Sequence, residues 1–284
     1  MNENKLKIHW FPGHMTKALR LIESELKNID VVIYVLDARA PLSCINPSLD
    51  NLTNNKPILY VLNKEDLANS EETEKYIKFL KRENTDCVST NSTLTKINDY
   101  VITKINSLCK QKIDKYKEKN INITIKAMVV GVPNCGKSTL INSLCNKAKT
   151  VSGNKPGVTR GKQWVRISNN IELLDMPGTL WPSFSNQTTA KNLAYIGSIK
   201  DDVLDINELS LEFIKDIINL DKTILEKRYN IKIENQDEPV DILEKIGYSR
   251  KFLIKGGEID YDRTSFTLLD EFRKGKLGRI TLKC

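Results

Sequence analysis

Residues 131–138 read Gly-Val-Pro-Asn-Cys-Gly-Lys-Ser and match the pattern G-x-x-x-x-G-K-[ST]. Glycines in such a loop let successive backbone N–H groups wrap around phosphates at the start of a helix. We expect Lys137 to reach the β- and γ-phosphates of a nucleotide and the Ser138 hydroxyl to coordinate Mg²⁺. An apolar, strand-like run precedes the motif and a helical pattern follows it. This order argues against a chance match.

A second motif, Asn63-Lys64-Glu65-Asp66, matches the guanine-reading pattern N-K-x-D and follows another apolar run. The Asp66 carboxylate can accept hydrogen bonds from N1–H and the 2-amino group of guanine, while Asn63 supports the loop and Lys64 packs on the base. Glu65 fills the variable position. Adenine lacks this pair of donors, so the motif predicts specificity for guanine.

Three loops could complete a nucleotide site. Asn91-Ser92 is the candidate for the loop that backs the base, with a plain turn as the alternative. Asp175-Met176-Pro177-Gly178 matches D-x-x-G: Asp175 is expected to hold Mg²⁺ through water and the Gly178 N–H to sense the γ-phosphate. Thr159, in Pro156-Gly157-Val158-Thr159, could close on Mg²⁺ when the γ-phosphate is present. An ordinary surface loop is the alternative for the Thr159 segment.

The order of these motifs is unusual. Ordinary GTPases run from phosphate loop to switch to guanine reader, whereas here Asn63–Asp66 precedes Gly131–Ser138. The chain therefore looks like a circularly permuted GTPase. A consequence is that the switch at Asp175–Gly178 leads directly into the C-terminal part.

One expected side chain is missing. Many GTPases place a Gln directly after D-x-x-G to orient the attacking water, but this chain has Thr179-Leu180-Trp181. The candidate replacement is His14, in a turn followed by a helical pattern, because an imidazole can orient or deprotonate water. The alternative is that His14 only caps or packs.

Short β-rich apolar runs predict the sheet that carries these loops. The runs span residues 31–38, 57–63, 87–89 and 124–131. Helical patterns between them span residues 15–28, 71–81, 95–117 and 137–145. Residues 163–167 and 171–175 read as a hairpin around Ser168–Asn170. The alternation predicts an α/β fold with a doubly wound, mostly parallel sheet and a site at the strands' carboxyl ends.

Beyond Gly178 the pattern becomes helical, at residues 206–219, 222–228, 240–246 and 265–274. We therefore divide the chain into a permuted GTPase domain, 1–185, and an all-helical domain, 186–284. Within the first domain, residues 1–120 carry the N-terminal helix and the guanine-reading half. Residues 121–185 carry the phosphate loop and the switches.

Positive charge is concentrated before the helical part, within a net charge of +8. Residues 145–166 contain no acid and six basic side chains: Lys147, Lys149, Lys155, Arg160, Lys162 and Arg166. Residues 104–126 add seven lysines against Asp114 and Glu118. Such clusters suit a polyanion, and RNA is the one we expect. A solvated lysine face is the alternative.

Composition favours a cytoplasmic protein. Hydrophobic content of 40% with 28% charged residues fits a soluble globular protein. No apolar run has the length of a membrane span or a signal peptide. The six cysteines show no C-x-x-C pair and no histidines in metal-site spacing, which favours a reducing compartment over a disulfide framework or zinc site.

The permuted order, together with HWFPGHMTKA, NKED, GVPNCGKST, PGVTRG and DMPGTLWP, resembles the bacterial ribosome biogenesis GTPase A family over nearly the whole chain. The resemblance implies a Mg²⁺-dependent, ribosome-stimulated GTPase that assists late assembly of the large ribosomal subunit and contacts its rRNA with both domains. Residues 186–284 would then form a helical domain that binds RNA and the ribosome. We expect a cytoplasmic monomer that binds neither membrane nor DNA.

The resemblance also assigns roles. GTP or GDP would be bound by Asn63, Lys64, Glu65, Asp66, Asn91, Ser92, Asn134, Cys135, Gly136, Lys137, Ser138, Thr139 and Gly178. His14, with Lys137 and Thr159, would serve catalysis, and Ser138, Thr159 and Asp175 would hold Mg²⁺. Asn134 matches the asparagine linked in related GTPases to a potassium ion beside the phosphates. Thr179 departs from the hydrophobic residue usual at its position.

Two other readings remain open. A small-subunit assembly GTPase is the nearest, although permuted relatives of that kind carry a zinc module or an N-terminal barrel, and the sequence shows neither. A GTP-regulated RNA-binding module with negligible hydrolysis is the second. The missing Gln favours it, and the intact Lys137, Ser138, Thr159 and Asp175 argue against it.

Overall fold

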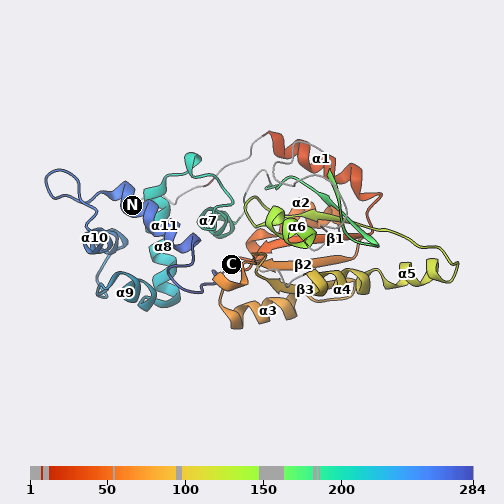
Figure 1. The fold of residues 1–284 in the computed structure, drawn as a ribbon. Helices are drawn as coiled ribbons and strands as arrows, with labels where there is room; N and C mark the ends of the chain where they lie inside the picture. Colours follow the sequence, from red (N-terminus) through yellow and green to blue (C-terminus); the bar gives the residue numbers. More distant parts are fainter. Residues whose placement is uncertain are drawn as a thin grey trace. The chain divides into compact units, whose positions relative to one another are not determined.

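A computed structural model gives the fold of the chain (Figure 1). It describes residues 8, 13–53, 55–93, 98–146, 163–181, 184 and 186–283. These residues form two compact units. One contains the described residues from 13 to 181 together with 281–283, and the other contains Ile8, Phe184 and residues 186–280.

The first unit is built on a six-stranded sheet in the order β3-β2-β1-β4-β6-β5. Its strands are β1 (Val31–Asp37), β2 (Ile58–Asn63), β3 (Thr85–Thr90), β4 (Ile125–Val130), β5 (Gln163–Ser168) and β6 (Ile171–Asp175). All neighbouring pairs are parallel except β5 with β6, which form the expected antiparallel hairpin. The prediction of a doubly wound, mostly parallel sheet is confirmed.

Burial of the central strands shows that both faces of this sheet are covered. Every residue of β1 and of β2 is buried, which an apolar run in a parallel sheet achieves only with helices on both sides. Helices α3 and α4 pack against β2 and β3, and α6 packs against β5 and β6 (Figure 1). The helices of this unit are α1 (His14–Leu26), α2 (Pro47–Thr53), α3 (Ser70–Leu80), α4 (Asn98–Leu108), α5 (Lys110–Lys117) and α6 (Lys137–Asn146).

The strand order sets the position of the site. The chain winds from β1 outward through β2 to β3, then returns to β4 on the other side of β1, so the direction of winding reverses between β1 and β4. Ligands of open α/β sheets bind in the crevice at such a reversal. The register brings strand ends together: Asp37 lies opposite Asn63, Asn63 opposite Thr90, and Val129 opposite Asp175.

The second unit is helical apart from one isolated antiparallel bridge, Leu253 with Ile259, within its described residues. In its core, Phe213 of α8 lies between Tyr195 of α7, which it meets edge to face, and Phe272 of α11, at ring-centroid distances of 5.0 and 4.9 Å. The helices are α7 (Gln187–Tyr195), α8 (Ile206–Asp221), α9 (Thr223–Tyr229), α10 (Pro239–Arg250) and α11 (Tyr261–Arg273). This confirms the expected helical C-terminal region.

The last residues of the chain pack in the first unit. The Leu282 N–H donates to the Arg39 carbonyl at 2.7 Å, and the Asn69 N–H donates to the Thr281 hydroxyl at 3.1 Å. Thr281 and Leu282 are buried. The sequence analysis placed these residues with the helical domain, because three residues carry no pattern that reveals such a return.

Two helices of the described residues were not predicted from the sequence, and one predicted helix is divided in two. Residues 47–53 and 187–195 form α2 and α7, which carry too few apolar residues for a clear helical period. The single helix expected over residues 95–117 is two helices within its described part, separated at Cys109. In the parts of the chain that are described, no helix is long and apolar enough to cross a membrane.

Candidate functional site

The phosphate loop leaves β4 in a conformation that depends on glycine. Gly131 and Gly136 have φ of 150° and 96°, where side chains are disfavoured. A Cβ on Gly131 would lie 2.3 Å from the Val35 carbonyl oxygen, and a Cβ on Gly136 would lie 2.1 Å from the Asn63 amide nitrogen. The loop therefore fits against β1 and the guanine-reading motif only because these residues lack side chains.

Helix α6 begins at Lys137, as the motif predicts. Lys137 is buried, and its ammonium donates to the carbonyls of Gly131 and Val132 at 3.1 and 2.9 Å. Ser138 and Thr139, which follow it, are exposed. An ammonium held inside the loop and hydroxyls open to solvent at a helix N-terminus are the groups that bind phosphates and their metal ion.

The D-x-x-G segment lies directly against the phosphate loop. A Cβ on Gly178 would be 2.9 Å from the Lys137 ammonium and 2.9 Å from backbone atoms of Pro133. The Thr179 N–H donates to the Gly131 carbonyl at 3.2 Å. Asp175, at the end of β6, is buried. The structure thus brings the switch and the phosphate lysine together.

Thr179 itself is turned inward. Its side chain is fully buried, and its hydroxyl accepts a hydrogen bond from the Asn46 amide at 3.5 Å. Asn46 is also buried, and its N–H donates to the Tyr34 hydroxyl at 2.6 Å. The residue at the usual position of the water-orienting Gln is therefore held in the protein interior, away from solvent.

Asn63 joins three loops. Its amide nitrogen donates to the Cys135 carbonyl at 2.9 Å, and its amide oxygen accepts from the N–H and the hydroxyl of Ser92 at 3.1 and 2.6 Å. All of these groups are buried. This side chain fixes the guanine-reading motif to the phosphate loop on one side and to the Asn91–Ser92 turn on the other.

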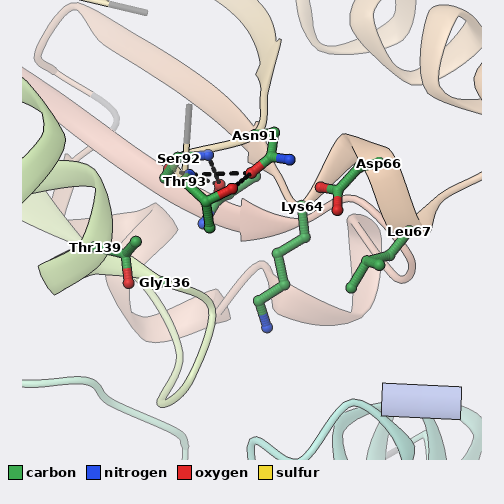
Figure 2. A pocket seen from close by; sticks show the side chains of 9 residues that line it. Lys64, Asp66, Leu67, Asn91, Ser92, Thr93, Gly136 and Thr139 are labelled. Carbon is green, nitrogen blue, oxygen red and sulfur yellow. Dashed lines mark hydrogen bonds between the residues drawn. The ribbon is translucent and has the colours of Figure 1, made fainter. Parts of the chain in front are cut away.

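Figure 2 shows the pocket that results, with residues of all three loops pointing toward it. Asp66 is exposed at its edge, so its carboxylate is open to a base. The pocket is lined by Asn63, Lys64, Asp66, Leu67, Asn91, Ser92, Thr93, Gly136 and Thr139. Leu67 and Thr93 were not expected from the sequence, since neither belongs to a recognised motif.

Lys64 crosses from the guanine-reading loop to the phosphate loop. Its ammonium donates to the Asn134 carbonyl at 2.7 Å and to the Asp37 carboxylate at 2.8 Å. Both Lys64 and Asn134 are left-handed, with φ of 60° and 57°. Asp37 and its partner Arg39 are further residues that the sequence analysis did not single out, because D-A-R after a strand has no recognisable pattern.

The start of α1 lies beside the switch. The Leu180 N–H, two residues after Gly178, points to the Met15 sulfur at 3.3 Å, and Met15 is buried. His14 is the first residue of α1, but its side chain lies outside the described residues. Thr159 and the basic residues between 147 and 162 also lie outside them.

Comparison with known proteins gives a family model that matches part of the chain and relatives that match nearly its full length. Residues 126–245 match the family model described as 50S ribosome-binding GTPase. Ribosome biogenesis GTPase A of Bacillus cereus is 41% identical over 97% of this chain and 93% of its own length. The protein of the same name from Priestia megaterium is 37% identical over 97% of this chain and 96% of its own.

Solved structures agree with the observed fold. The GNP-bound YlqF from T. maritima matches with a TM-score of 0.61 at 26% identity, covering 94% of this chain and 97% of that chain. A GDP-bound YlqF matches with a TM-score of 0.66 at 24% identity, covering 93% and 98%. The second match bears on the fold alone.

Proposed function

This chain belongs to the ribosome biogenesis GTPase A family, and from that premise we propose that it assists assembly of the large ribosomal subunit and hydrolyses GTP in response to it. It is a guanine-nucleotide-binding GTPase by family. The precursor of the large subunit and its rRNA are the proposed partners. We propose that it acts as a monomer in the cytoplasm and binds neither membrane nor DNA.

The observation that carries this proposal is the set of hydrogen bonds made by the Asn63 side chain. This one buried amide is hydrogen-bonded both to the phosphate loop and to the Asn91–Ser92 turn. In our proposal Asp66 reads the guanine edge, and Lys64 and Asn91–Ser92 flank the base. Asn134–Thr139 and Gly178 surround the phosphates, and Glu65 fills the variable position of the guanine-reading motif.

Two cations belong to the proposal. Ser138, Thr159 and Asp175 would hold Mg²⁺, since hydroxyl and carboxylate oxygens beside phosphates are the ligands this ion takes. Bound there, the ion neutralises negative charge on the phosphates. Asn134, exposed and left-handed within the phosphate loop, is the residue proposed to support a potassium ion. Lys137 contributes a fixed positive charge, and His14 is the proposed catalytic residue.

Large subunits are expected to stimulate GTP turnover strongly. An isolated GTPase that has its Gln turns over at only about 10⁻⁴–10⁻³ per second, and a partner adds roughly 10³–10⁵-fold. Because Thr179 is held inside the protein, a partner should matter at least as much here. Phosphate release is to be measured with purified large subunits, small subunits, or neither.

The outcomes distinguish the three candidate functions. Stimulation by large subunits alone supports the proposal. Equal stimulation by both would favour a small-subunit or general RNA partner, and turnover at the unstimulated level in all three would favour a GTP-regulated binding module. A Lys137→Ala variant serves as the control for contaminating nucleotidases, since it removes the phosphate-binding ammonium.

The affinity for the large subunit is expected to fall with salt concentration because of the basic segment, residues 145–166. Neutralising Lys147, Lys149, Lys162 and Arg166 should reduce affinity and flatten the dependence of log K on log salt, by about 0.7–0.9 for each lost phosphate contact. Sedimentation with large subunits over a salt series measures both. The control neutralises four basic residues of α3 and the turn after it: Lys75, Lys78, Lys81 and Arg82. If the two variants behave alike, the segment acts only through net charge.

A further inference from the structure

Two buried charged groups, Asp37 and Arg39, form a cluster with Lys64, which lines the nucleotide pocket. Asp37, the last residue of β1, is 0% exposed and Arg39 is 1% exposed. One Asp37 oxygen accepts from the Arg39 N–H and Nε at 3.1 and 2.9 Å. The other accepts from Arg39 Nη2 at 2.7 Å and from the Lys64 ammonium at 2.8 Å.

This arrangement keeps the carboxylate charged. Burial by itself raises the pKa of a carboxyl, but Arg39 and Lys64, both cationic and hydrogen-bonded to it, lower the pKa of Asp37 to about 2. An anion in the interior requires such partners. Arg39 occupies one side of the carboxylate in a fork of two hydrogen bonds, which fixes its orientation. The oxygen presented to Lys64 therefore has a defined position.

Lys64 needs such a fixed partner. Its backbone is left-handed, a conformation disfavoured for a residue with a side chain, and its long side chain is flexible when free. Here the ammonium is bound from two sides, by Asp37 and by the Asn134 carbonyl. Asn134 is itself left-handed and exposed at the turn of the phosphate loop. The ammonium thus links the two loops that must enclose a nucleotide.

We propose that Asp37 is a positioning residue for guanine nucleotides: its carboxylate, oriented by Arg39, holds the Lys64 ammonium against the phosphate loop. Asp37 does not line the pocket and acts only through Lys64. The inference rests on the proposed function, since it concerns the affinity of that same site.

The test is a double-mutant cycle on the full-length protein, with GDP affinity measured by titration calorimetry. Asp37→Asn is expected to weaken GDP binding about ten- to hundredfold, the range for one hydrogen bond between charged groups. In a Lys64→Met background the same change is expected to weaken binding by less than about threefold, because no ammonium remains to be held. Equal losses in both backgrounds would overturn the proposal, since Asp37 would then act without Lys64.

Asp86→Asn is the matched control. Asp86 is also a buried strand carboxylate that binds a lysine, accepting from the Lys104 ammonium at 2.8 Å. It lies opposite Leu59, near the start of β2 and so away from the strand ends that carry the pocket. GDP affinity of this variant is expected to stay within about twofold of the wild type. A loss as large as that of Asp37→Asn would show a general effect of sheet stability and would overturn the proposal.

Asp37→Asn leaves the Arg39 guanidinium buried without its anion, which can prevent folding. The pair Asp37→Asn with Arg39→Gln removes both charges and is expected to fold with the same loss of affinity. Wild-type affinity in this folded variant would overturn the proposal. So would failure of both variants to fold, judged by circular dichroism, because Asp37 would then be a stability residue. A wild-type protein that does not bind GDP would instead contradict the proposed function.

Discussion

An Asp66→Asn variant is expected to lose about 10²–10⁴-fold in affinity for GDP and GTP while tolerating xanthosine nucleotides better. In the proposed site the carboxylate accepts two hydrogen bonds from guanine, each worth about 1.5–3 kcal/mol because one partner is charged, and 1.4 kcal/mol corresponds to tenfold. The amide of Asn presents a donor where guanine also has one. Xanthine carries an oxygen at that position and accepts the new donor.

Equilibrium binding of GDP and xanthosine diphosphate to both proteins measures this exchange. Glu74→Gln is the matched control, since Glu74 is an exposed carboxylate on α3 that does not line the pocket, and its neutralisation should leave guanine affinity unchanged. Asp66 is exposed and lines the pocket, so its substitution should not disturb folding. Unchanged guanine binding in the Asp66 variant would refute the assignment of this loop.

His14→Ala is expected to keep GTP and subunit binding and to lose most of the subunit-stimulated turnover, out of the roughly 10³–10⁵-fold that a partner can add. A loss of rate without a loss of affinity is the signature of a contact made only in the transition state. Two observations motivate the expectation. Helix α1 starts at His14, and the next residue, Met15, contacts the backbone of Leu180 just after the switch.

Single-turnover kinetics with saturating large subunits, beside sedimentation of the same mixtures, separates rate from binding. Lys17→Ala is a suitable control because Lys17 is exposed on α1 one turn further along and should leave the rate intact. Near-normal stimulated turnover in the His14 variant would leave it a packing residue. The catalytic group would then have to come from elsewhere, including the ribosome.

The sequence predicted those parts of the fold that depend on a pattern among neighbouring residues. Runs such as Val31–Asp37 and Ile58–Asn63 are apolar throughout, so their burial in a parallel sheet could be inferred from composition and length. The role of Gly131 and Gly136 in the phosphate loop was predicted from the spacing of the motif. Helix α2 was missed because its signals are a cap and a proline: the Asn46 side chain accepts from the Ser48 N–H, and Pro47 starts the helix.

Contacts between distant segments could not be predicted. The role of Asp37 depends on its distance from Lys64, and that of Asn46 on its distance from Thr179. Neither pair is linked by a sequence pattern, since register and loop conformation alone bring them together. The candidate nucleotide site was thus predicted from motifs, whereas the side chains that hold its loops in place were found only from the fold.

The return of the chain at Thr281–Leu282 makes the helical unit an insertion in the nucleotide-binding unit and not an appendage to its end. Residues before and after this insertion belong to the nucleotide-binding unit, and the last of them form hydrogen bonds with Arg39 and Asn69. A fragment that stops before the helical unit would therefore lack part of the nucleotide-binding unit, including the hydrogen-bond donor to the Arg39 carbonyl.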